Sequence, residues 1–479
     1  MDTFDYFKQI CQIPRESHNE EGMRQYLLAW AKENGLEAIR DEAGNIIVKK
    51  PATPGFENVP SVALQGHMDM VCVKTPESNH DFTKDPIEVY EDGDFLRAKG
   101  TSLGGDNGIA VAMTMAIFTD PTAQHGPLEA IFTFAEETGM DGAFALDASH
   151  INSKKLINLD SEEEGVIYIG CAGGIDLVGS LETELDDVPE DWETVEISVG
   201  GLKGGHSGAE IDRGRANAIS VLARLLMSID EMGTPFMINA FNGGTRRNVI
   251  PSSASCRICF PAKTKKETMT HVLEEFENIK QENRFEDPGL TIEKHCTACG
   301  AQKAEKAIGA EVSAILAKAL FACPHGVFTM SKALPGVVET SDNLAIVKVN
   351  DGKLHLEISV RSNIESAKYY LVNRIKTILE SFGIDCKVGD GYPSWAPNPD
   401  SELAKFCAQA YEQMTGKKAV VTAIHAGLEC GVISSKVPGM DSVSIGPNLY
   451  DVHSTNEHLS ISSSKRMYDY LKKLLSIIC

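Results

Sequence analysis

The 479-residue sequence lacks several features that would place a protein in a specialised class. No apolar run approaches the roughly 18 residues that a membrane span needs, and the segment Met1–Asp5 has neither the basic start nor the apolar core of a secretory signal. Basic blocks are absent too, and 68 acidic against 45 basic residues give a formal charge of −23. We therefore expect a cytoplasmic protein with no nucleic-acid partner and no membrane partner.

The sequence also lacks a compact disulfide framework, because its 12 cysteines are scattered along the chain. Two CxxC pairs, Cys256–Cys259 and Cys296–Cys299, could in principle form a structural zinc site, but such pairs usually lie closer together. Ser255–Phe260 is also typical of a strand, which would send Cys256 and Cys259 to opposite faces. We therefore expect reduced thiols and no zinc at these cysteines.

The length favours two or three domains, and 42% hydrophobic residues allow a large core. The strand pattern changes at about Gly174, and the Gly- and Pro-rich segment 389–399 marks a return. The predicted parts are a first catalytic part, an inserted lid domain and a second catalytic part, residues 1–174, 175–390 and 391–479.

The inserted part contains a weak internal repeat. A strand, a charged amphipathic helix and a strand follow each other over residues 253–294, and the same order recurs over residues 353–388. This pattern predicts a lid of two similar α+β halves.

The N-terminal 50 residues show helix and hairpin signals. Residues 3–35 have a helical pattern, in which Ser17 to Glu20 resembles a capping box. Glu37–Lys50, with Gly44-Asn45 in its middle, predicts a hairpin.

The organising stretch is Val62–Leu64, an apolar run typical of a strand buried on both faces, followed by His67 and Asp69. Two residues apart in extended chain, these side chains would share one side at the carboxyl end of a strand, where α/β sheets bind ligands. Imidazole is a common metal ligand, and a carboxylate often orients it. For this pair alone, a solvated turn is the simpler explanation.

Two further strands end in carboxylates. Leu128–Ala135 leads into Glu136 and Glu137, and Lys155–Asn158 leads to Asp160. Adjacent carboxylates after an apolar strand require cations or exposure, so an exposed acidic turn is the alternative to a metal site.

A glycine-rich turn and a late loop add two more candidates. Asp106 lies among glycines before the apolar run Ile109–Phe118, which predicts a buried helix. The turn matches neither G-x-G-x-x-G nor the Walker spacing, so we expect no nucleotide there. His453 lies in a loop before the last predicted helix, and alone it would more often be structural.

Together these segments resemble the M20 family of co-catalytic zinc peptidases over the whole chain. The motifs are His67-x-Asp69, Gly-Asp106-Asn-Gly, Glu136-Glu137-x-Gly, Asp160 and His453-x-x-x-Glu457. The local sequences GGDNG, EETGMDGA, LDSEEEG, HAGLECG and DVHS look like the aminoacyl-histidine dipeptidase branch of that family. The resemblance implies an α/β catalytic domain with a central mixed sheet flanked by helices, beside the inserted lid.

The resemblance also implies two Zn²⁺ ions per chain. Asp106 would bridge them, His67 and Asp160 would complete one site, and Glu137 and His453 would complete the other. Nitrogen and oxygen ligands suit zinc, with Co²⁺ or Mn²⁺ as substitutes. Asp69 would orient His67, and Glu136 would be the general base.

For the substrate, the resemblance implies that His206 in Gly-Gly-His206-Ser-Gly stabilises the oxyanion. The sequence departs from the family in the first lid half, where Ile258-Cys-Phe-Pro stands in place of Asp-x-Arg. Arg361 in the second half, with Asn343 upstream, looks like the missing arginine and would bind the substrate carboxylate. A solvated strand-end cation is the alternative for Arg361.

Such a doubled lid would not need a second chain to complete the site, so a homodimer is compatible with the sequence but not required. Glu429, in a glycine-flanked turn, would hold the substrate amine or be an ordinary turn carboxylate.

The predicted function is hydrolysis of short unblocked peptides, mainly dipeptides, including Xaa-His substrates such as carnosine. A tripeptidase or an N-acyl amino acid deacylase with the same centre is the alternative, because fold and metals do not separate these activities. A metal-stabilised binding protein without turnover is a further alternative. Glu136 beside Glu137 argues against it, since a structural site has no use for an unligated base.

Overall fold

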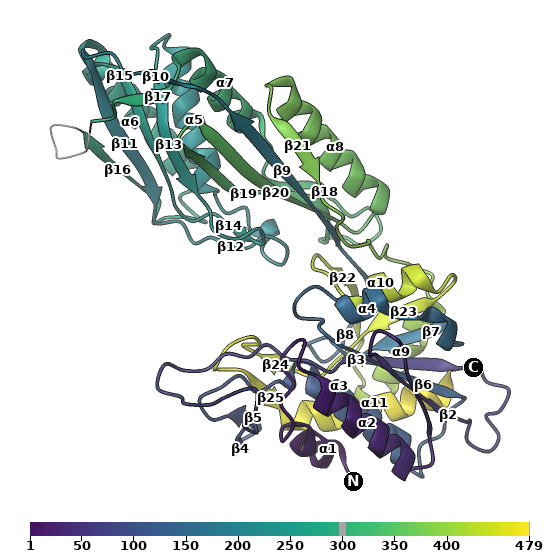
Figure 1. The fold of residues 1–479 in the computed structure, drawn as a ribbon. Coiled ribbons are helices and arrows are strands. Elements are labelled where there is room, and N and C mark those ends of the chain that lie inside the picture. Colours follow the sequence, from purple (N-terminus) through teal and green to yellow (C-terminus); the bar gives the residue numbers. More distant parts are fainter. Residues whose placement is uncertain (297–302, 479) are drawn as a thin grey trace. The chain divides into compact units, whose positions relative to one another are not determined.

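The computed structural model describes residues 1–296 and 303–478, which divide into two compact units (Figure 1). Unit 1 comprises Met1–Cys171, Trp395–Ala423 and Leu428–Cys479, and unit 2 comprises Ala172–Ser394 and Ile424–Gly427. Unit 2 therefore includes a short turn near residue 425 that the sequence pattern had placed in the second catalytic part.

The core of unit 1 is an eight-stranded mixed sheet. In order across the sheet, its strands are β1 (Glu37–Arg40), β2 (Ile46–Lys50), β6 (Leu128–Thr133), β3 (Val62–His67), β7 (Lys155–Asn158), β23 (Asp441–Ser444), β8 (Val166–Cys171) and β22 (Val420–Ile424). The four central strands, β6, β3, β7 and β23, are parallel, and antiparallel pairs flank them. Every residue of β3 and β6 is buried, as strands covered on both faces must be.

Helices flank this sheet (Figure 1). They are α1 (Thr3–Ile10), α2 (Glu21–Glu33), α3 (Gly105–Thr119), α9 (Glu402–Thr415) and α11 (Ile461–Ile477), with the shorter α4 (Asp141–Ala145) and α10 (Glu429–Lys436). The predicted buried helix is confirmed, since α3 is buried nearly all round and packs against β3 and α1. The predicted α/β class with a mixed sheet flanked by helices is likewise confirmed. Within the described ranges, no helix is long and apolar enough to cross a membrane.

The N-terminal region differs from the sequence prediction. Residues 3–35 form two helices, α1 and α2, separated by a loop that contains Pro14. The predicted capping box is wrong, because Glu20 is the N-cap of α2 but its side chain makes no capping hydrogen bond. Both Ser17 and Glu20 instead contact distant parts of unit 1. The predicted hairpin is confirmed by the antiparallel pair β1–β2.

A second, four-stranded sheet completes unit 1. Its strands are, in order, β24 (Leu449–Tyr450), β25 (His458–Ser460), β5 (Phe95–Ala98) and β4 (Val89–Asp92). The loop between β24 and β25 contains both His453 and Glu457, so this small sheet holds the late loop by both ends.

Unit 2 is built on an eleven-stranded sheet. Its main path is β16 (Thr291–Cys296), β11 (Trp192–Gly200), β15 (Ala254–Pro261), β13 (Met237–Gly243), β19 (Val338–Asn350), β20 (Lys353–Ser362), β9 (Gly173–Glu182) and β21 (Asp385–Val388). Off this path lie β10 (Leu185–Asp187), β17 (Lys306–Ile308) and β18 (Gly326–Met330), and a separate pair joins β12 (Gly205–His206) to β14 (Val249–Ile250). The helices are α5 (Ala218–Glu231), α6 (Lys265–Glu282), α7 (Ala310–Ala322) and α8 (Glu365–Ser381).

The strand order of unit 2 reveals its internal repeat. Along the chain, β11-α5-β13-β15-α6-β16 and β9-α7-β19-β20-α8-β21 have the same order of elements. Across the sheet, β16-β11-β15-β13 and β21-β9-β20-β19 also correspond strand for strand, in the arrangement of a split βαβ fold. The halves join where β13 pairs with β19, which confirms the two similar α+β halves.

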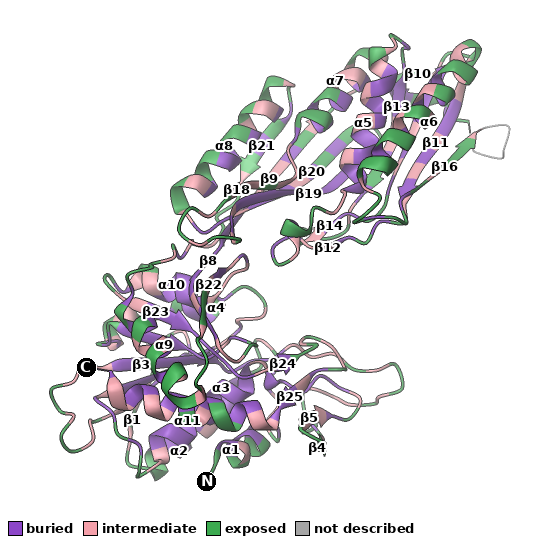
Figure 2. Ribbon diagram, turned by 180° about the vertical axis from the view of Figure 1, so that it is seen from behind, coloured by how far each residue is buried: buried purple, intermediate pink, exposed green. Residues whose placement is uncertain are grey.

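In unit 2, α6, α7 and α8 are buried on one face and exposed on the other, whereas α5 is buried nearly all round (Figure 2). In α8 the buried side chains include Leu371, Ile375 and Leu379, at the spacing of one helix face. Cys256 and Cys259 on β15 belong to two different core clusters, so the prediction that they face opposite sides is confirmed. Cys299 lies outside the described residues.

Candidate metal centre

Three neighbouring parallel strands, β6, β3 and β7, end at the same edge of the unit 1 sheet. His67 is the last residue of β3 and Asp69 follows it, while Glu136 and Glu137 follow β6 and Asp160 follows β7. Because the carboxyl ends of adjacent parallel strands meet at one edge, residues from three distant stretches gather there.

Asp106 reaches the same edge from the first turn of α3. Glu457 accepts hydrogen bonds from four successive backbone N–H groups, those of Leu103, Gly104, Gly105 and Asp106, at 2.7, 3.0, 2.8 and 3.3 Å. These amides would otherwise lack partners at the start of a helix, so the Glu457 carboxylate fixes the backbone that carries Asp106. The sequence motif contained Glu457 but indicated no role for it.

Asp106 lies between two histidines. His67 Nε2 is 3.0 Å from Asp106 Oδ1, and His453 Nε2 is 3.2 Å from Asp106 Oδ2. Beyond each histidine lies one more carboxylate, Asp160 Oδ1 at 3.4 Å from His67 Nε2 and Glu137 Oε2 at 3.0 Å from His453 Nε2. All five predicted ligands therefore meet in unit 1, in two sets that share Asp106.

The donor set fits metal ions. Ligand atoms of His67, Asp106 and Glu137 lie within 4.8 Å of one another. Within residues 1–296 and 303–478, the buried atoms Glu137 Oε1 and Asp160 Oδ1 have no hydrogen-bond partner. Buried carboxylate oxygens are costly without a cation or a donor, so this structure contains a candidate metal site.

The charges of the cluster also favour bound cations. Burial, together with the neighbouring carboxylates Asp106 and Glu137, raises the pKa of Asp160 to about 7 against the lowering effect of His67. Burial likewise raises the pKa of Glu136 well above its usual value, with Asp160 and Glu137 adding to the effect. The cluster therefore holds more negative charge than its two histidines balance, which favours bound cations.

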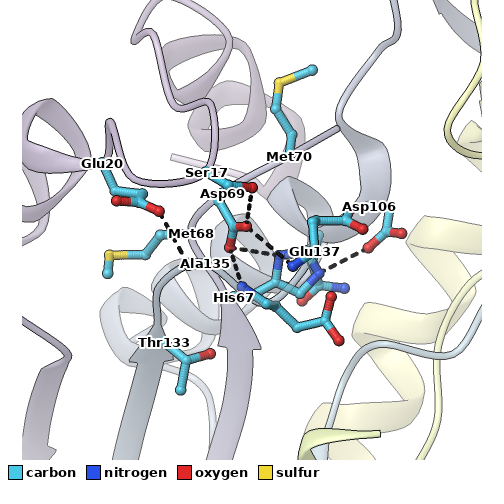
Figure 3. Close-up of polar contacts among 12 residues, drawn as sticks. Ser17, Glu20, His67, Met68, Asp69, Met70, Asp106, Thr133, Ala135 and Glu137 are labelled. Atoms are coloured by element: carbon cyan, nitrogen blue, oxygen red, sulfur yellow. Dashed lines mark hydrogen bonds and ion pairs between the residues drawn. The ribbon is translucent and has the colours of Figure 1, made fainter. Parts of the chain in front are cut away.

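Asp69 makes contacts to the end of β3 and to two loops at once (Figure 3). Its Oδ1 is 3.3 Å from His67 Nδ1 and accepts from the Glu136 N–H at 3.1 Å. Its Oδ2 accepts from the Glu137 N–H at 3.3 Å and from Ser17 Oγ at 2.7 Å. Although burial acts to raise it, the contacts with His67 lower the pKa of Asp69 to about 2. Asp69 can thus orient His67, as expected, and it also fixes the backbone of Glu136 and Glu137.

Glu429 is the first residue of α10 and is fully buried. Its Oε2 accepts hydrogen bonds from Gln65 Nε2 and from Thr133 Oγ1, the latter at 2.7 Å. Within the described part of the chain its Oε1 has no partner. This carboxylate has no exposed surface in the structure, so no contact with a substrate amine is visible. Its role towards a substrate amine stays a prediction.

His206, Arg361 and Asn343 belong to unit 2. His206 Nδ1 accepts hydrogen bonds from the backbone N–H groups of Gly208 and Ala209, at 3.2 and 2.9 Å. Because Nδ1 accepts these hydrogen bonds, the ring proton must be on Nε2. Burial, and to a smaller extent the nearby positive charge of Arg361, lowers the pKa of His206. His206 is therefore a neutral imidazole whose Nε2 carries the N–H, and an N–H donor is what stabilisation of an oxyanion requires.

Arg361 lines a pocket of about 570 Å³ within unit 2, together with Asp176, Arg247, Glu357 and Tyr392. Its Nη1 donates to the Tyr392 hydroxyl at 2.7 Å, and its Nε has no partner among the described residues. The guanidinium is therefore anchored through Nη1, while Nε is buried without a hydrogen bond, and binding of a substrate carboxylate by Arg361 stays a prediction.

Asn343 has a different setting. Its Nδ2 donates to the backbone carbonyls of Arg247 and Val249, at 3.1 and 2.9 Å. The amide donors thus hold the loop before β14 and the first residue of β14, and Oδ1 stays unpartnered within the described ranges. A direct contact of Asn343 with substrate would use this oxygen, and it stays a prediction.

Comparison with known proteins identifies the family. The model of peptidase family M20/M25/M40 matches residues 63–477. The chain belongs to this family. The M20 resemblance seen in the motifs is thereby confirmed, and this M20 member is a hydrolase of the metallopeptidase class.

Two relatives of this M20 chain match it over its whole length. It is 40% identical over 476 residues to the cytosol non-specific dipeptidase of Escherichia coli strain K12, covering 99% of this chain and 97% of the relative. The crystal structure of aminoacylhistidine dipeptidase from Vibrio alginolyticus superposes with a TM-score of 0.92 at 37% identity, covering 100% of this chain and 96% of that chain. Aminopeptidase PepT from Bacillus cereus, at 16% identity and a TM-score of 0.57, covers 99% of this chain and 97% of its own and shows the shared fold.

Proposed function

We propose that this M20 chain hydrolyses the peptide bond of short unblocked dipeptides, including Xaa-His dipeptides such as carnosine. The observation that carries the proposal is the arrangement of His67 and His453 on opposite oxygens of Asp106. The two full-length relatives, a non-specific dipeptidase and an aminoacylhistidine dipeptidase, support the same substrate class.

The residues that would hold two zinc ions follow from the two sets around Asp106. His67 and Asp160 would complete one site with Asp106, and Glu137 and His453 would complete the other. When bound, the ions supply Lewis acidity for the peptide carbonyl and acidify a water molecule. Co²⁺ or Mn²⁺ would substitute in this set of nitrogen and oxygen donors.

The chain's own groups would handle the proton and the substrate. Glu136, whose pKa is raised well above its usual value by burial and by its acidic neighbours, takes a proton from the attacking water and returns it to the leaving amine. Asp69 holds the Glu136 backbone during this transfer. In unit 2, His206 Nε2–H would donate to the oxyanion, and Arg361 would bind the substrate carboxylate.

A panel of four substrates tests this proposal. Carnosine, a dipeptide without histidine, a tripeptide and an N-acetyl amino acid are assayed side by side on protein whose zinc content has been measured. We expect turnover of both dipeptides by chain containing two equivalents of zinc. Turnover of the tripeptide or of the acetylated amino acid alone would assign the chain to the tripeptidase or deacylase alternative.

The proposal extends to location and assembly. The relative from Escherichia coli is named as a cytosol dipeptidase, and we propose a cytoplasmic location for this chain as well. A homodimer stays a prediction that sedimentation of the purified chain would test.

A further inference from the structure

The loop between α1 and α2 reaches the candidate metal centre, although the family match begins only at residue 63. Arg15 in this loop is buried, and its Nη1 donates to the backbone carbonyls of Met68 and Asp69, at 3.2 and 2.8 Å. Its Nη2 donates to the carbonyl of Gly104, and the Arg15 carbonyl accepts from the Met70 N–H at 3.1 Å. One side chain therefore ties the loop after β3 to the turn before α3.

Ser17 in the same loop holds the Asp69 carboxylate (Figure 3). A carboxylate has about four lone-pair positions, and Asp69 uses its oxygens for Ser17, His67 and the N–H groups of Glu136 and Glu137. The Ser17 contact, at 2.7 Å, is the shortest of the four, while the others measure between 3.1 and 3.3 Å. Without the hydroxyl, Oδ2 would keep one long hydrogen bond, and the carboxylate would be free to tilt away from His67.

Glu20 holds the other side of the same turn. Its Oε1 accepts from the Ala135 N–H at 3.1 Å, and its Oε2 accepts from Arg24 Nη2 at 3.2 Å. Ala135 has a φ of 47°, a left-handed conformation that is uncommon for a residue with a Cβ. This turn points the next two N–H groups at Asp69. Glu20 is fully buried and leaves the start of its own helix uncapped. Its Oε1 also accepts from the His18 N–H at 2.7 Å, so the carboxylate joins its own loop to this turn.

We propose that Ser17 and Glu20 are positioning residues that set the place of the Glu136 and Glu137 carboxylates. Ser17 acts through Asp69, and Glu20 acts through the backbone of Ala135. The role given to Glu136 rests on the proposed function, whereas the effect on Glu137 and His67 concerns metal binding alone. A simple structural role for the loop would stabilise the fold without changing either metal affinity or the chemical step.

The test compares variants of the full chain that lose one positioning contact with matched controls. Ser17→Ala removes the hydroxyl, Ser17→Thr retains it, and Glu20→Gln weakens the acceptor. Ser401→Ala is the control for the serine, because Ser401 Oγ donates to Asp441 at 2.6 Å in a different part of unit 1. Glu129→Gln is the control for the glutamate, because buried Glu129 accepts the Ser153 N–H at 2.9 Å, and Ser153 is no part of the centre.

Zinc affinity is measured first, without substrate, by titrating metal-free chain with Zn²⁺ against a chromophoric chelator. Residues that orient metal ligands typically change affinity or activity by about 10–100-fold. We expect Ser17→Ala to lose zinc affinity in that range, Ser17→Thr to recover most of it, and both control variants to match the wild type. Wild-type zinc affinity in Ser17→Ala and Glu20→Gln would overturn the proposal.

Kinetics on a dipeptide provide the second measurement. For Ser17→Ala and Glu20→Gln we expect kcat to fall about 10–100-fold while KM changes little, because substrate contacts are untouched. Changes confined to thermal stability, equal to those of Ser401→Ala and Glu129→Gln, would show a merely structural role and overturn the proposal. Failure of the proposed function is distinguishable, since it would appear as a wild-type chain that binds zinc but cleaves no dipeptide.

Discussion

Glu136 donates its backbone N–H to Asp69 Oδ1 at 3.1 Å, so these two residues form one hydrogen-bonded unit. The same Asp69 oxygen lies 3.3 Å from His67 Nδ1. A metal ligand and the proposed base therefore share a single acceptor. Any change at Asp69 must act on metal binding and on proton transfer together.

Asp69→Asn tests this coupling. Both oxygens of Asp69 now face hydrogen-bond donors. In either orientation of the asparagine amide, its NH₂ group would replace one of these oxygens and face a donor instead of accepting from it. We expect zinc affinity and kcat to fall together, each by about 10–100-fold. Zinc titration and dipeptide kinetics on the same preparation check this. A variant that loses activity but keeps full zinc affinity would contradict the shared role.

Glu136→Gln should separate chemistry from metal binding. Glutamine has nearly the shape of glutamate but cannot accept a proton at this position, and general base catalysis typically contributes about 10²–10⁴-fold. We expect kcat to fall by that factor while zinc content stays that of the wild type, because neither set around Asp106 includes Glu136. Metal analysis and steady-state kinetics measure the two effects. Full activity in this variant would disprove the assignment of the base.

Zinc removal should affect stability as well as turnover. The buried, unpartnered oxygens of Glu137 and Asp160 repel each other without a cation, so binding of zinc should stabilise unit 1. At a free zinc concentration about 100-fold above Kd, linkage gives about 2.7 kcal/mol. We expect chelation to lower the Tm and abolish turnover, and added zinc to restore both. Asp106→Asn should show no such response, and a zinc-induced rise in its Tm would count against Asp106 as the bridging ligand.

Part of this site was predictable because three of its segments each follow a predicted strand. The apolar run before His67, the strand before Glu136 and the strand before Asp160 are visible in single segments. Because adjacent parallel strands end at the same edge of a sheet, the residues that follow these strands are expected to lie close together. The doubled unit 2 was likewise visible as a repeated order of elements.

The contacts around these ligands were not predictable, because their partners are far apart in sequence. Ser17 and Glu20 have the local pattern of a capping box, yet Ser17 donates to Asp69, 52 residues away, and Glu20 accepts from Ala135, 115 residues away, besides its local partners. Glu457 caps the start of α3 across more than 350 residues. A local motif gives the same signal whether its polar groups cap a helix or hold a distant loop, so tertiary contacts decide its use.

Arg361→Ala should change the recognition of a free carboxylate. The guanidinium is held by the Tyr392 hydroxyl and has an unpartnered Nε within the described part of unit 2. A charge-assisted hydrogen bond is worth about 1.5–3 kcal/mol, so we expect KM for a dipeptide to rise about 10–100-fold. KM for the corresponding dipeptide amide should change little. Arg257→Ala, which removes a surface pair with Glu196, is the control. Equal effects on the dipeptide and its amide would contradict carboxylate binding by Arg361.

Asp342 on β19 gives a prediction about the pH dependence of stability. It is buried, its Oδ2 has no partner among the described residues, and burial raises its pKa to about 8. The unfolded chain has an ordinary aspartate pKa of about 3.9, so between these values the folded state holds a proton that the unfolded state releases. Stability from this group is therefore present at acid pH and lost as the pH rises towards 8.

Asp342→Asn should remove this loss, because the amide stays neutral at every pH. The variant's free energy of unfolding, relative to wild type, should rise with pH by up to about 1.4 kcal/mol per unit between pH 5 and 8. Urea unfolding followed through unit 2 at several pH values measures this difference. Asp385→Asn, at an exposed position of the same sheet, should give a constant difference. Since all other titrating groups are common to wild type and variant, a pH-independent difference for Asp342→Asn would show that Asp342 is already ionised in the folded chain.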